Sequence, residues 1–430
     1  MLELEEKPRK AAVVAVQLPD VSDEEFGESL TELGRLARTL GLELTATLTQ
    51  KRSHFEPGHY VGAGKLDELK ALVDGGTADT LLIDHEITPS QARNLEKATG
   101  ADVLDRTAVI LEIFHRHARS RVAKAQVEIV RLQYMAPRLR EAGKGKDRQR
   151  GGIGGKGAGE SNLELDRRKI RDRIAELQAE LGSMEEEQKT RRARRGEVPT
   201  VALVGYTNAG KSTLMRALTG SEVYVADKLF ATLDTTVRVL VPETRPRILV
   251  SDTVGFIKKL PHGLVASFKS TLDEALEASL LAHVIDVSDP AWERQYDVTS
   301  DVLEEIGAGA VARLAVFNKL DKVGDAAAQA RVIESLASRF PGAVFMSARA
   351  PGDVAHLHAA LVAFFHRDLV EEELRVGYDR QHLRGRIFEE CQVLGESYDE
   401  GAVTFRVRAH PDTLARLRQL ASAPPAAQPQ

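Results

Sequence analysis

The segment at residues 201–213, VALVGYTNAGKST, constrains the fold of this chain more than any other. An apolar run leads into Gly205-Tyr206-Thr207-Asn208-Ala209-Gly210-Lys211-Ser212-Thr213, which contains the phosphate-loop pattern G-x-x-x-x-G-K-[ST]. Such a loop lies between a buried strand and a helix, so that backbone N–H groups and the positive helix end meet phosphate oxygens. The pattern therefore predicts a parallel α/β domain that binds a nucleotide. Lys211 would contact the β- and γ-phosphates, and the Ser212 hydroxyl would bind Mg²⁺.

The segment Asp252-Thr253-Val254-Gly255 follows a second apolar run and predicts the next part of such a site. Asp252 can hold Mg²⁺ through water, and the Gly255 N–H can meet the γ-phosphate. Phe256 comes next, where many small GTPases place a glutamine that orients the attacking water. Because a phenyl ring cannot polarise water, we expect slow intrinsic hydrolysis and a partner that supplies the missing positioning. The alternative is that another residue of this chain does so.

Two later segments predict that the base is guanine. Asn318-Lys319-Leu320-Asp321 follows an apolar run, and the Asp321 carboxylate can accept hydrogen bonds from N1–H and N2–H₂ of guanine. Adenine lacks that pair of donors, and a buried carboxylate left without them is costly, so ATP should be disfavoured. Ser347-Ala348-Arg349 follows another apolar run and offers a backbone N–H to guanine O6. Four such segments in this order predict a GTPase.

The segment Phe230-Ala231-Thr232-Leu233-Asp234-Thr235-Thr236 contains the candidates for a switch threonine. A hydroxyl that binds Mg²⁺ only when the γ-phosphate is present would order this loop in the GTP state. Spacing alone does not choose among the three threonines, and a polar surface loop is the alternative.

The nucleotide motifs place their α/β domain at residues 198–368. The rest of the chain predicts three more parts. Residues 1–115 alternate apolar strands, at 11–18, 42–49, 80–84 and 101–105, with helices that begin near Ser22, Lys65 and Pro89. This alternation predicts a small α/β domain with a mainly parallel sheet. Residues 116–197 carry two amphipathic helical patterns around the loop 143–161, which predicts an antiparallel helical hairpin. Residues 369–430 predict a small C-terminal α/β domain with a disordered tail.

Charge is unevenly distributed along the chain. The net charge is −5, yet residues 116–195 hold 22 Lys and Arg against 12 Asp and Glu. The glycine-rich loop 143–161 also carries five cations: Lys144, Lys146, Arg148, Arg150 and Lys156. This concentration favours a polyanionic partner that binds at one place. A solvated helical face and a flexible linker are the alternatives.

The same sequence excludes several classes of protein. There is one cysteine, Cys391, so no intramolecular disulfide forms. No run of about 18 apolar residues predicts a membrane span, and the N-terminus lacks the pattern of a signal peptide. We expect a monomer in the cytoplasm, with at most peripheral association with a membrane.

These motifs together resemble the HflX family of translational GTPases. The resemblance rests on the nucleotide motifs and on earlier segments, namely Asp105-Arg106-Thr107, Ala125-Gln126-Val127-Glu128, Gly151-Gly152-Ile153-Gly154 and Glu160-Ser161. It implies a GTPase that binds the large ribosomal subunit and its 23S rRNA, and that splits stalled or idle ribosomes, notably under heat stress. It also implies that Ser212 and Thr232 are the Mg²⁺ ligands, that Lys211, Thr232 and Gly255 act in catalysis, and that 205–213, 230–234, 252–255, 318–321 and 347–349 line the GTP site.

Other interpretations stay open at this stage. The chain could be a GTP-regulated rRNA chaperone or ribosome assembly factor, or a signalling switch with a protein partner, which the basic segment argues against. Some members of the family that it resembles also hydrolyse ATP through the N-terminal domain. Gly62-Ala63-Gly64-Lys65 is the nearest candidate for a phosphate loop there, and a turn before a helix is the favoured alternative.

Overall fold

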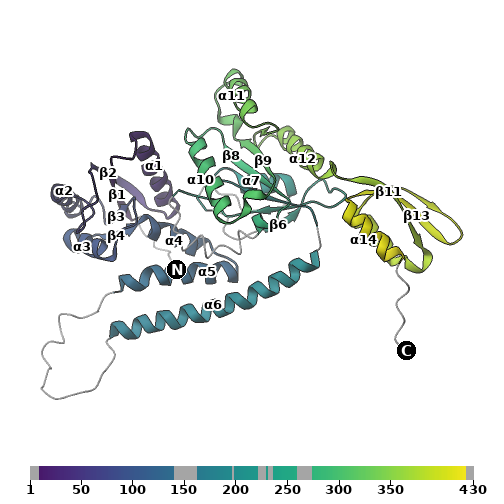
Figure 1. The fold of residues 1–430 in the computed structure, drawn as a ribbon. Coiled ribbons are helices and arrows are strands. Elements are labelled where there is room, and N and C mark those ends of the chain that lie inside the picture. The colour runs from purple at the N-terminus through teal and green to yellow at the C-terminus, as the bar shows by residue number, and fades with distance from the viewer. Residues whose placement is uncertain are drawn as a thin grey trace, which may run out of the picture. The chain divides into compact units, whose positions relative to one another are not determined.

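The structure is a computed structural model that describes residues 9–139, 162–195, 198–220, 229–230, 236–258 and 274–422 (Figure 1). These residues divide into two compact units. The first holds the described residues up to 191 together with 229–230 and 257–258, and the second holds the rest. Each unit is described by itself.

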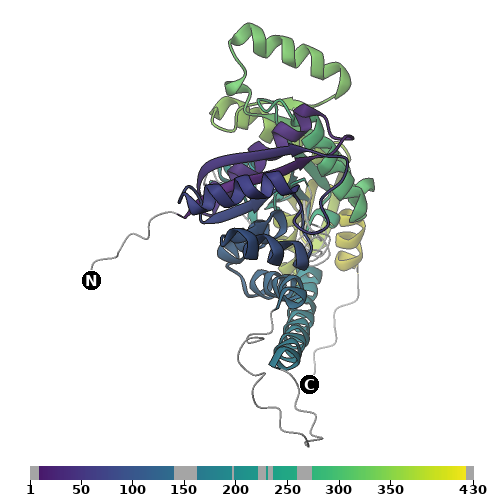
Figure 2. The ribbon, with the colours of Figure 1, turned by 90° about the vertical axis from the view of Figure 1, so that its left-hand side faces the viewer.

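The first unit begins with a parallel four-stranded sheet in the order β2-β1-β3-β4. Its strands are β1 (Lys10–Gln17), β2 (Glu43–Lys51), β3 (Thr80–Ile83) and β4 (Asp102–Asp105). Its helices are α1 (Asp23–Thr39), α2 (Ala63–Asp74), α3 (Pro89–Thr99) and α4 (Arg106–His117), and Figure 2 shows them around the sheet. The central strand β1 is apolar and almost wholly buried, as a parallel sheet covered by helices requires. The alternating pattern of the sequence therefore predicted this part of the fold correctly.

Two long helices follow in the same unit and lie side by side in Figures 1 and 2. They are α5 (Arg121–Met135), which ends in the short helix η1 (Ala136–Arg138), and α6 (Asn162–Arg195). Ala125 and Ile129 of α5 are buried with Leu177 of α6, at the spacing of three to four residues seen in the sequence. This packing agrees with the predicted hairpin. The predicted glycine-rich loop, 143–161, lies outside the described residues.

The second unit contains a six-stranded sheet in the order β10-β9-β8-β5-β7-β6, parallel except that β6 is antiparallel to β7. Its strands are β5 (Thr200–Val204), β6 (Thr236–Val239), β7 (Leu249–Asp252), β8 (Leu280–Asp286), β9 (Arg313–Asn318) and β10 (Val344–Phe345). Its helices are α7 (Lys211–Thr219), α10 (Trp292–Glu305), α11 (Ala326–Arg339) and α12 (Pro351–His366), with the short helices η2 (Ala308–Ala310) and η3 (Leu320–Lys322). Leu214 of α7 and Leu357 of α12 belong to the same buried core as Val201 and Val284 of the sheet. This core fixes the strand ends from which the nucleotide motifs emerge.

The C-terminal part of the second unit has a three-stranded sheet in the order β11-β13-β12, which is antiparallel. Its elements are β11 (Val370–Gly377), η4 (Tyr378–Arg380), α13 (His382–Glu390), β12 (Gln392–Tyr398), β13 (Ala402–Ala409) and α14 (Pro411–Ser422). Only three residues join β12 to β13, which permits a hairpin and is too short for a parallel crossover. Residues 423–430, where the sequence predicted a disordered tail, lie outside the described part.

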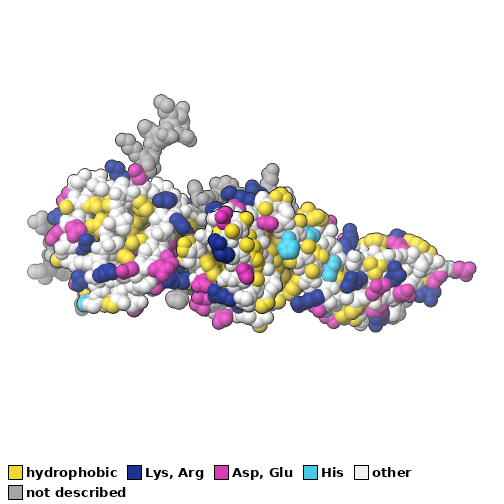
Figure 3. Space-filling view, turned by 90° about the horizontal axis from the view of Figure 1, so that it is seen from above, with side chains coloured by type: hydrophobic (Ala, Val, Ile, Leu, Met, Phe, Trp, Pro, Cys, Tyr) yellow, Lys and Arg dark blue, Asp and Glu magenta, His cyan; other side chains and the backbone are white. Residues whose placement is uncertain are grey.

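The described surface carries acidic and basic side chains interspersed with one another, as Figure 3 shows for one face. No helix among the described residues is long and apolar enough to cross a membrane.

Candidate nucleotide site

The loop after β5 has the backbone shape of a phosphate loop. Gly205 has φ 148°, Asn208 φ 61° and Gly210 φ 101°, all in regions that glycine or asparagine adopts most easily. A Cβ on Gly205 would lie 2.2 Å from the Val284 carbonyl oxygen, and one on Gly210 would lie 2.3 Å from Asn318 Nδ2. Both glycines are therefore required for the loop to lie this close to its neighbours.

The N-cap of the helix that follows the loop has no side chain. Gly210 is the N-cap of α7 and provides no side-chain hydrogen bond. The first N–H groups of a helix have no partner within the helix, and together with the helix dipole they favour an anion at this end. The loop and the start of α7 can therefore receive phosphate oxygens.

Lys211 is buried at the base of the loop, with 6% of its surface exposed. Its ammonium donates to the carbonyl oxygens of Gly205 at 3.0 Å and Tyr206 at 2.9 Å. Burial lowers the pKa of Lys211 to about 8, and the nearby charge of Asp252 acts in the opposite direction. An added phosphate would favour the charged form of this lysine, so the site is suited to an anionic ligand.

Ser212 and Asp252 bring two oxygen groups together beside the loop. The Ser212 hydroxyl donates to Asp252 Oδ2 at 2.8 Å, and Asp252 is fully buried at the end of β7. A hydroxyl and a carboxylate are the kinds of ligand that Mg²⁺ prefers. The donors present therefore fit a magnesium ion, which Ser212 could bind directly and Asp252 through water.

The segment after β7 lies directly on the phosphate loop. The N–H of Phe256 donates to the Gly205 carbonyl at 3.2 Å, and the N–H of Thr207 donates to the Phe256 carbonyl at 2.7 Å. A Cβ on Gly255 would lie 2.7 Å from Thr207 Cα and 3.1 Å from Lys211 Nζ. Only glycine allows so close an approach, and it places the Gly255 backbone beside the lysine that would hold the γ-phosphate. The Phe256 side chain is buried, with 2% of its surface exposed.

The segment after β9 holds the phosphate loop from the other side. Asn318 is buried, its Nδ2 donates to the Ala209 carbonyl at 2.8 Å, and its Oδ1 accepts from the Ala348 N–H at 2.9 Å. Lys319 donates to the Asn208 carbonyl at 2.7 Å. The contacts of these two side chains thus join three of the predicted segments.

The backbone N–H groups of Ser347, Ala348 and Arg349 already have acceptors. Ser347 N–H donates to Asp353 Oδ2 at 2.7 Å, Ala348 N–H to Asn318 Oδ1, and Arg349 N–H to Ser347 Oγ at 3.3 Å. A guanine O6 would therefore share or replace one of these acceptors. The segment lies beside Asn318, as expected of a base-binding loop.

Asp321 differs from the expectation in one respect. The desolvation argument treated its carboxylate as buried, and in the structure Asp321 is exposed in the first turn of η3. The cost of leaving it unpaired thus applies only once a base covers it. Leu320 beside it is fixed by a hydrogen bond from its N–H to the Met346 carbonyl at 3.1 Å.

The candidate switch segment is described only in part. Phe230 is buried in the first unit, where its ring meets Phe114 of α4 edge-on with centroids 4.5 Å apart. Its carbonyl accepts from His117 Nδ1 at 2.8 Å. The structure thus packs Phe230 on α4. Ala231, Thr232, Leu233, Asp234 and Thr235 lie outside the described residues, and Thr236 begins β6.

Two acidic residues at the site were missed in the sequence. Asp353 holds the Ser347 backbone, and Asp286, the last residue of β8, forms an ion pair with Lys319 at 2.7 Å. Asp286 did carry a signal, because a polar residue at the carboxyl end of a parallel strand belongs to the edge where ligands bind. Asp353 carried none, since it lies in the first turn of a surface helix.

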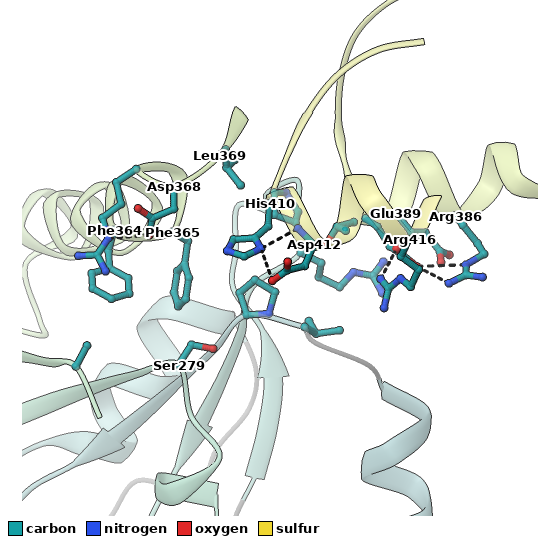
Figure 4. Close-up of a pocket in the computed structure, with 18 residues that line it drawn as sticks. Ser279, Phe364, Phe365, Asp368, Leu369, Arg386, Glu389, His410, Asp412 and Arg416 are labelled. Atoms are coloured by element: carbon teal, nitrogen blue, oxygen red, sulfur yellow. Dashed lines mark hydrogen bonds and ion pairs between the residues drawn. The ribbon is translucent and has the colours of Figure 1, made fainter. Parts of the chain in front are cut away.

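A cavity of about 530 Å³ in the second unit is a separate feature (Figure 4). Pro199 and Ser279, which line it, precede β5 and β8, so it lies at the sheet edge opposite the phosphate loop. Arg386 and Arg416 in its wall both pair with Glu390, at 3.2 and 2.7 Å. Since these charges are matched within the chain, the phosphate loop is the better candidate for a triphosphate.

Comparisons with known proteins agree with this geometry. Three family models match in succession: GTP-binding GTPase N-terminal over residues 27–115, GTP-binding GTPase Middle Region over 117–195, and 50S ribosome-binding GTPase over 200–319. The chain is 52% identical to the GTPase HflX of Gluconacetobacter diazotrophicus, across 95% of this chain and 97% of that one. It is 40% identical to the GTPase HflX of Caldanaerobacter subterraneus, across 97% and 95% of the two chains. The chain belongs to the HflX family.

The GTPase HflX of Escherichia coli is also similar, with 39% identity across 89% of each chain. This HflX protein is therefore a GTP-hydrolysing enzyme, with GTP as substrate and GDP as product.

Proposed function

We propose that this HflX protein binds the large ribosomal subunit and splits stalled or idle ribosomes, and that the ribosome stimulates its GTP hydrolysis. One observation carries the ribosome part. The start of α6, which follows the loop 143–161 in the sequence, presents five exposed cations: Arg167, Arg168, Lys169, Arg171 and Arg173. Two of them pair within the helix, Lys169 with Asp166 and Arg173 with Glu176, and the other three add positive charge beside these pairs. Such a cluster favours a phosphate backbone as partner. The match of residues 200–319 to a family described as 50S ribosome-binding GTPases supports the same partner.

The roles at the nucleotide follow from the contacts of the site. Lys211 would exchange its two carbonyl acceptors for phosphate oxygens, and the Gly255 N–H would meet the γ-phosphate beside it. Ser212 and Thr232 would hold Mg²⁺, which when bound supplies positive charge to the phosphates. Asp321 would read the edge of guanine. Because Phe256 is buried and apolar, the ribosome would supply the positioning of the attacking water.

The nucleotide state can change ribosome affinity only by binding more tightly to one conformation of the protein than to the other. In the proposed cycle the GTP form binds the large subunit, splitting follows, and hydrolysis lowers the affinity so that the protein leaves.

An rRNA chaperone is the second candidate, because the same cations would bind free rRNA. The two functions differ in what activates the enzyme. An intact subunit presents rRNA in its assembled form together with ribosomal proteins, whereas naked rRNA lacks those proteins.

We expect the GTPase rate of the full-length protein to rise at least tenfold with purified 50S subunits and to change less than twofold with naked 23S rRNA. Light scattering should show GTP-dependent dissociation of 70S ribosomes. Stimulation by naked rRNA alone would favour the chaperone, and no effect of either would contradict both proposals.

Variants can assign the ribosome contact to α6. Arg167→Gln with Arg171→Gln should weaken subunit binding about tenfold and reduce the salt dependence of binding by about two charges. Arg331→Gln with Arg339→Gln, on exposed positions of α11, removes the same charge elsewhere and should change binding less than twofold. Equal losses in the two variants would mean that net charge, and not this contact, governs binding.

A further inference from the structure

We propose that Asp286 is a positioning residue for guanine nucleotide binding, which acts by holding the Lys319 side chain in place. This inference rests on the guanine site proposed above. It begins from the Lys319 ammonium, which donates to the Asn208 carbonyl of the phosphate loop and to Asp286 Oδ2, each at 2.7 Å. The ammonium therefore joins the phosphate loop to the end of β8.

The carboxylate of Asp286 is itself fixed. Its other oxygen, Oδ1, accepts from the Ser288 hydroxyl at 2.6 Å and from the Ser288 N–H at 3.1 Å. Both oxygens are thus engaged, one by the turn after β8 and one by Lys319. A carboxylate oriented on both sides presents its charge to the lysine in a single geometry.

The strand register places this carboxylate beside the base-binding segment. Asp286 pairs with Asn318 across β8 and β9, and Lys319 is the first residue after β9. Lys319 has φ 63°, a left-handed conformation that turns the chain after the strand. The Lys319 and Asp286 side chains are 16% and 14% exposed, so water screens their attraction only in part.

A lysine held at both the loop and β8 loses little freedom when a nucleotide binds. Lysine has one of the most flexible side chains, and ordering it opposes binding unless it is ordered beforehand. Without Asp286, the Asn208 carbonyl would be the remaining acceptor in this pair of contacts, and part of the ordering cost would fall on the nucleotide. Lys319 lies two residues before Asp321, and its aliphatic stem has no group that could hydrogen-bond to a base. The loss of affinity should therefore be the same for every base that the site accepts.

Asp286→Ala should therefore raise the Kd of GDP and of a nonhydrolysable GTP analogue about tenfold, measured by calorimetry on the full-length protein. The loss should appear in KM for GTP and not in kcat, since Asp286 contacts Lys319 and Ser288 and not the lysine or glycine expected at the γ-phosphate. The ratio of GDP to xanthosine diphosphate affinity should stay unchanged. Asp286→Asn, which keeps the shape and one acceptor but not the charge, should give an intermediate loss.

Two comparisons separate positioning from structural damage. Asp301→Ala removes an exposed carboxylate of α10 and should leave the Kd within twofold. In a double-mutant cycle, Asp286→Ala should add less than twofold to the loss caused by Lys319→Met, because both changes remove one interaction.

Unchanged GDP affinity in Asp286→Ala, or fully additive losses in the cycle, would overturn the inference. If the unaltered protein bound no GDP, the guanine site itself would fail. If it bound GDP but ignored ribosomes, the proposed ribosome function would fail and the role of Asp286 would stand.

Discussion

The two mainly parallel sheets of this protein differ most at the carboxyl ends of their strands, where ligands bind in such folds. In the second unit, the segments after β5, β7 and β9 contact one another around one buried lysine, and Gly210 leaves the start of α7 without a side-chain cap. In the first unit, side chains fill the same edge. Arg106 after β4 is 2% exposed and pairs with Asp84 after β3 at 2.8 Å, and Ser29 donates to the same carboxylate at 2.7 Å.

The glycine-lysine segments of the two sheets show the same contrast. Gly62 is an N-cap with ordinary backbone angles, and Lys65 pairs with Glu68 at 2.7 Å. Gly62 thus caps α2 and residues 63–65 form its first turn, which is nearer to the alternative favoured from the sequence than to a phosphate loop. Gly205 and Gly210 instead adopt angles that keep the loop close to β8 and Asn318. The comparison indicates that both parallel sheets have an edge formed by the carboxyl ends of their strands. Backbone angles and side-chain volume then decide whether that edge can bind a ligand.

Substitution of the lysine in each glycine-lysine segment is the strongest test of this contrast. Lys211→Ala should abolish nucleotide binding, with a loss of at least about a thousandfold in GDP affinity, because a buried charged hydrogen-bonding group is removed from its phosphate. Lys65→Ala is the matched control and should leave the affinity within twofold. Calorimetry on both full-length variants measures this. Tight GTP binding by Lys211→Ala would mean that the nucleotide site has been misplaced.

Substitutions at the filled strand ends of the first sheet should change the free energy of unfolding. Arg106→Met leaves Asp84 buried without its guanidinium, which should destabilise the first unit by about 3–5 kcal/mol. Arg9→Met breaks a pair with Asp102 in which both side chains are about 70% exposed, and should cost less than about 1 kcal/mol.

Calorimetric unfolding of the full-length protein tests this. The transition to compare between variants is the one whose midpoint GDP does not shift, because GDP should bind the second unit. Equal effects of the two substitutions would show that the buried ion pair of Arg106 stabilises the first unit no more than an exposed ion pair does.

The same contrast explains what the sequence could predict. The phosphate loop and the segments at 252–255, 318–321 and 347–349 were placed correctly at strand ends, because local pattern and strand polarity decide those positions. The pairing of Asp286 with Lys319 was not predicted, since it joins residues 33 positions apart through strand register. The burial of Arg106 was missed for a similar reason. Its partners Ser29 and Asp84 come from distant elements, and arginine is seldom buried without such partners.

The substitution with the smallest expected effect tests how the nucleotide site of the second unit recognises guanine. Asp321→Asn should weaken GDP binding about tenfold to a hundredfold and strengthen xanthosine diphosphate binding by a similar factor. The new amide can donate to the xanthine O2 and accept from its N1–H, whereas guanine offers N2–H₂ to a group that now also donates.

Asp325→Asn makes the same chemical change four residues on, where the side chain caps α11 by accepting from the Ala328 N–H at 2.9 Å. Asparagine caps helices as well as aspartate does, so base preference should not move. Competition binding of the two diphosphates to each full-length variant gives the ratio directly. Because Asp321 is exposed where Asp84 is buried against Arg106, its charge remains available to a ligand. Unchanged guanine selectivity in Asp321→Asn would mean that an open edge with an exposed carboxylate is not enough to read a base, and that the backbone N–H groups at 347–349 set the preference instead.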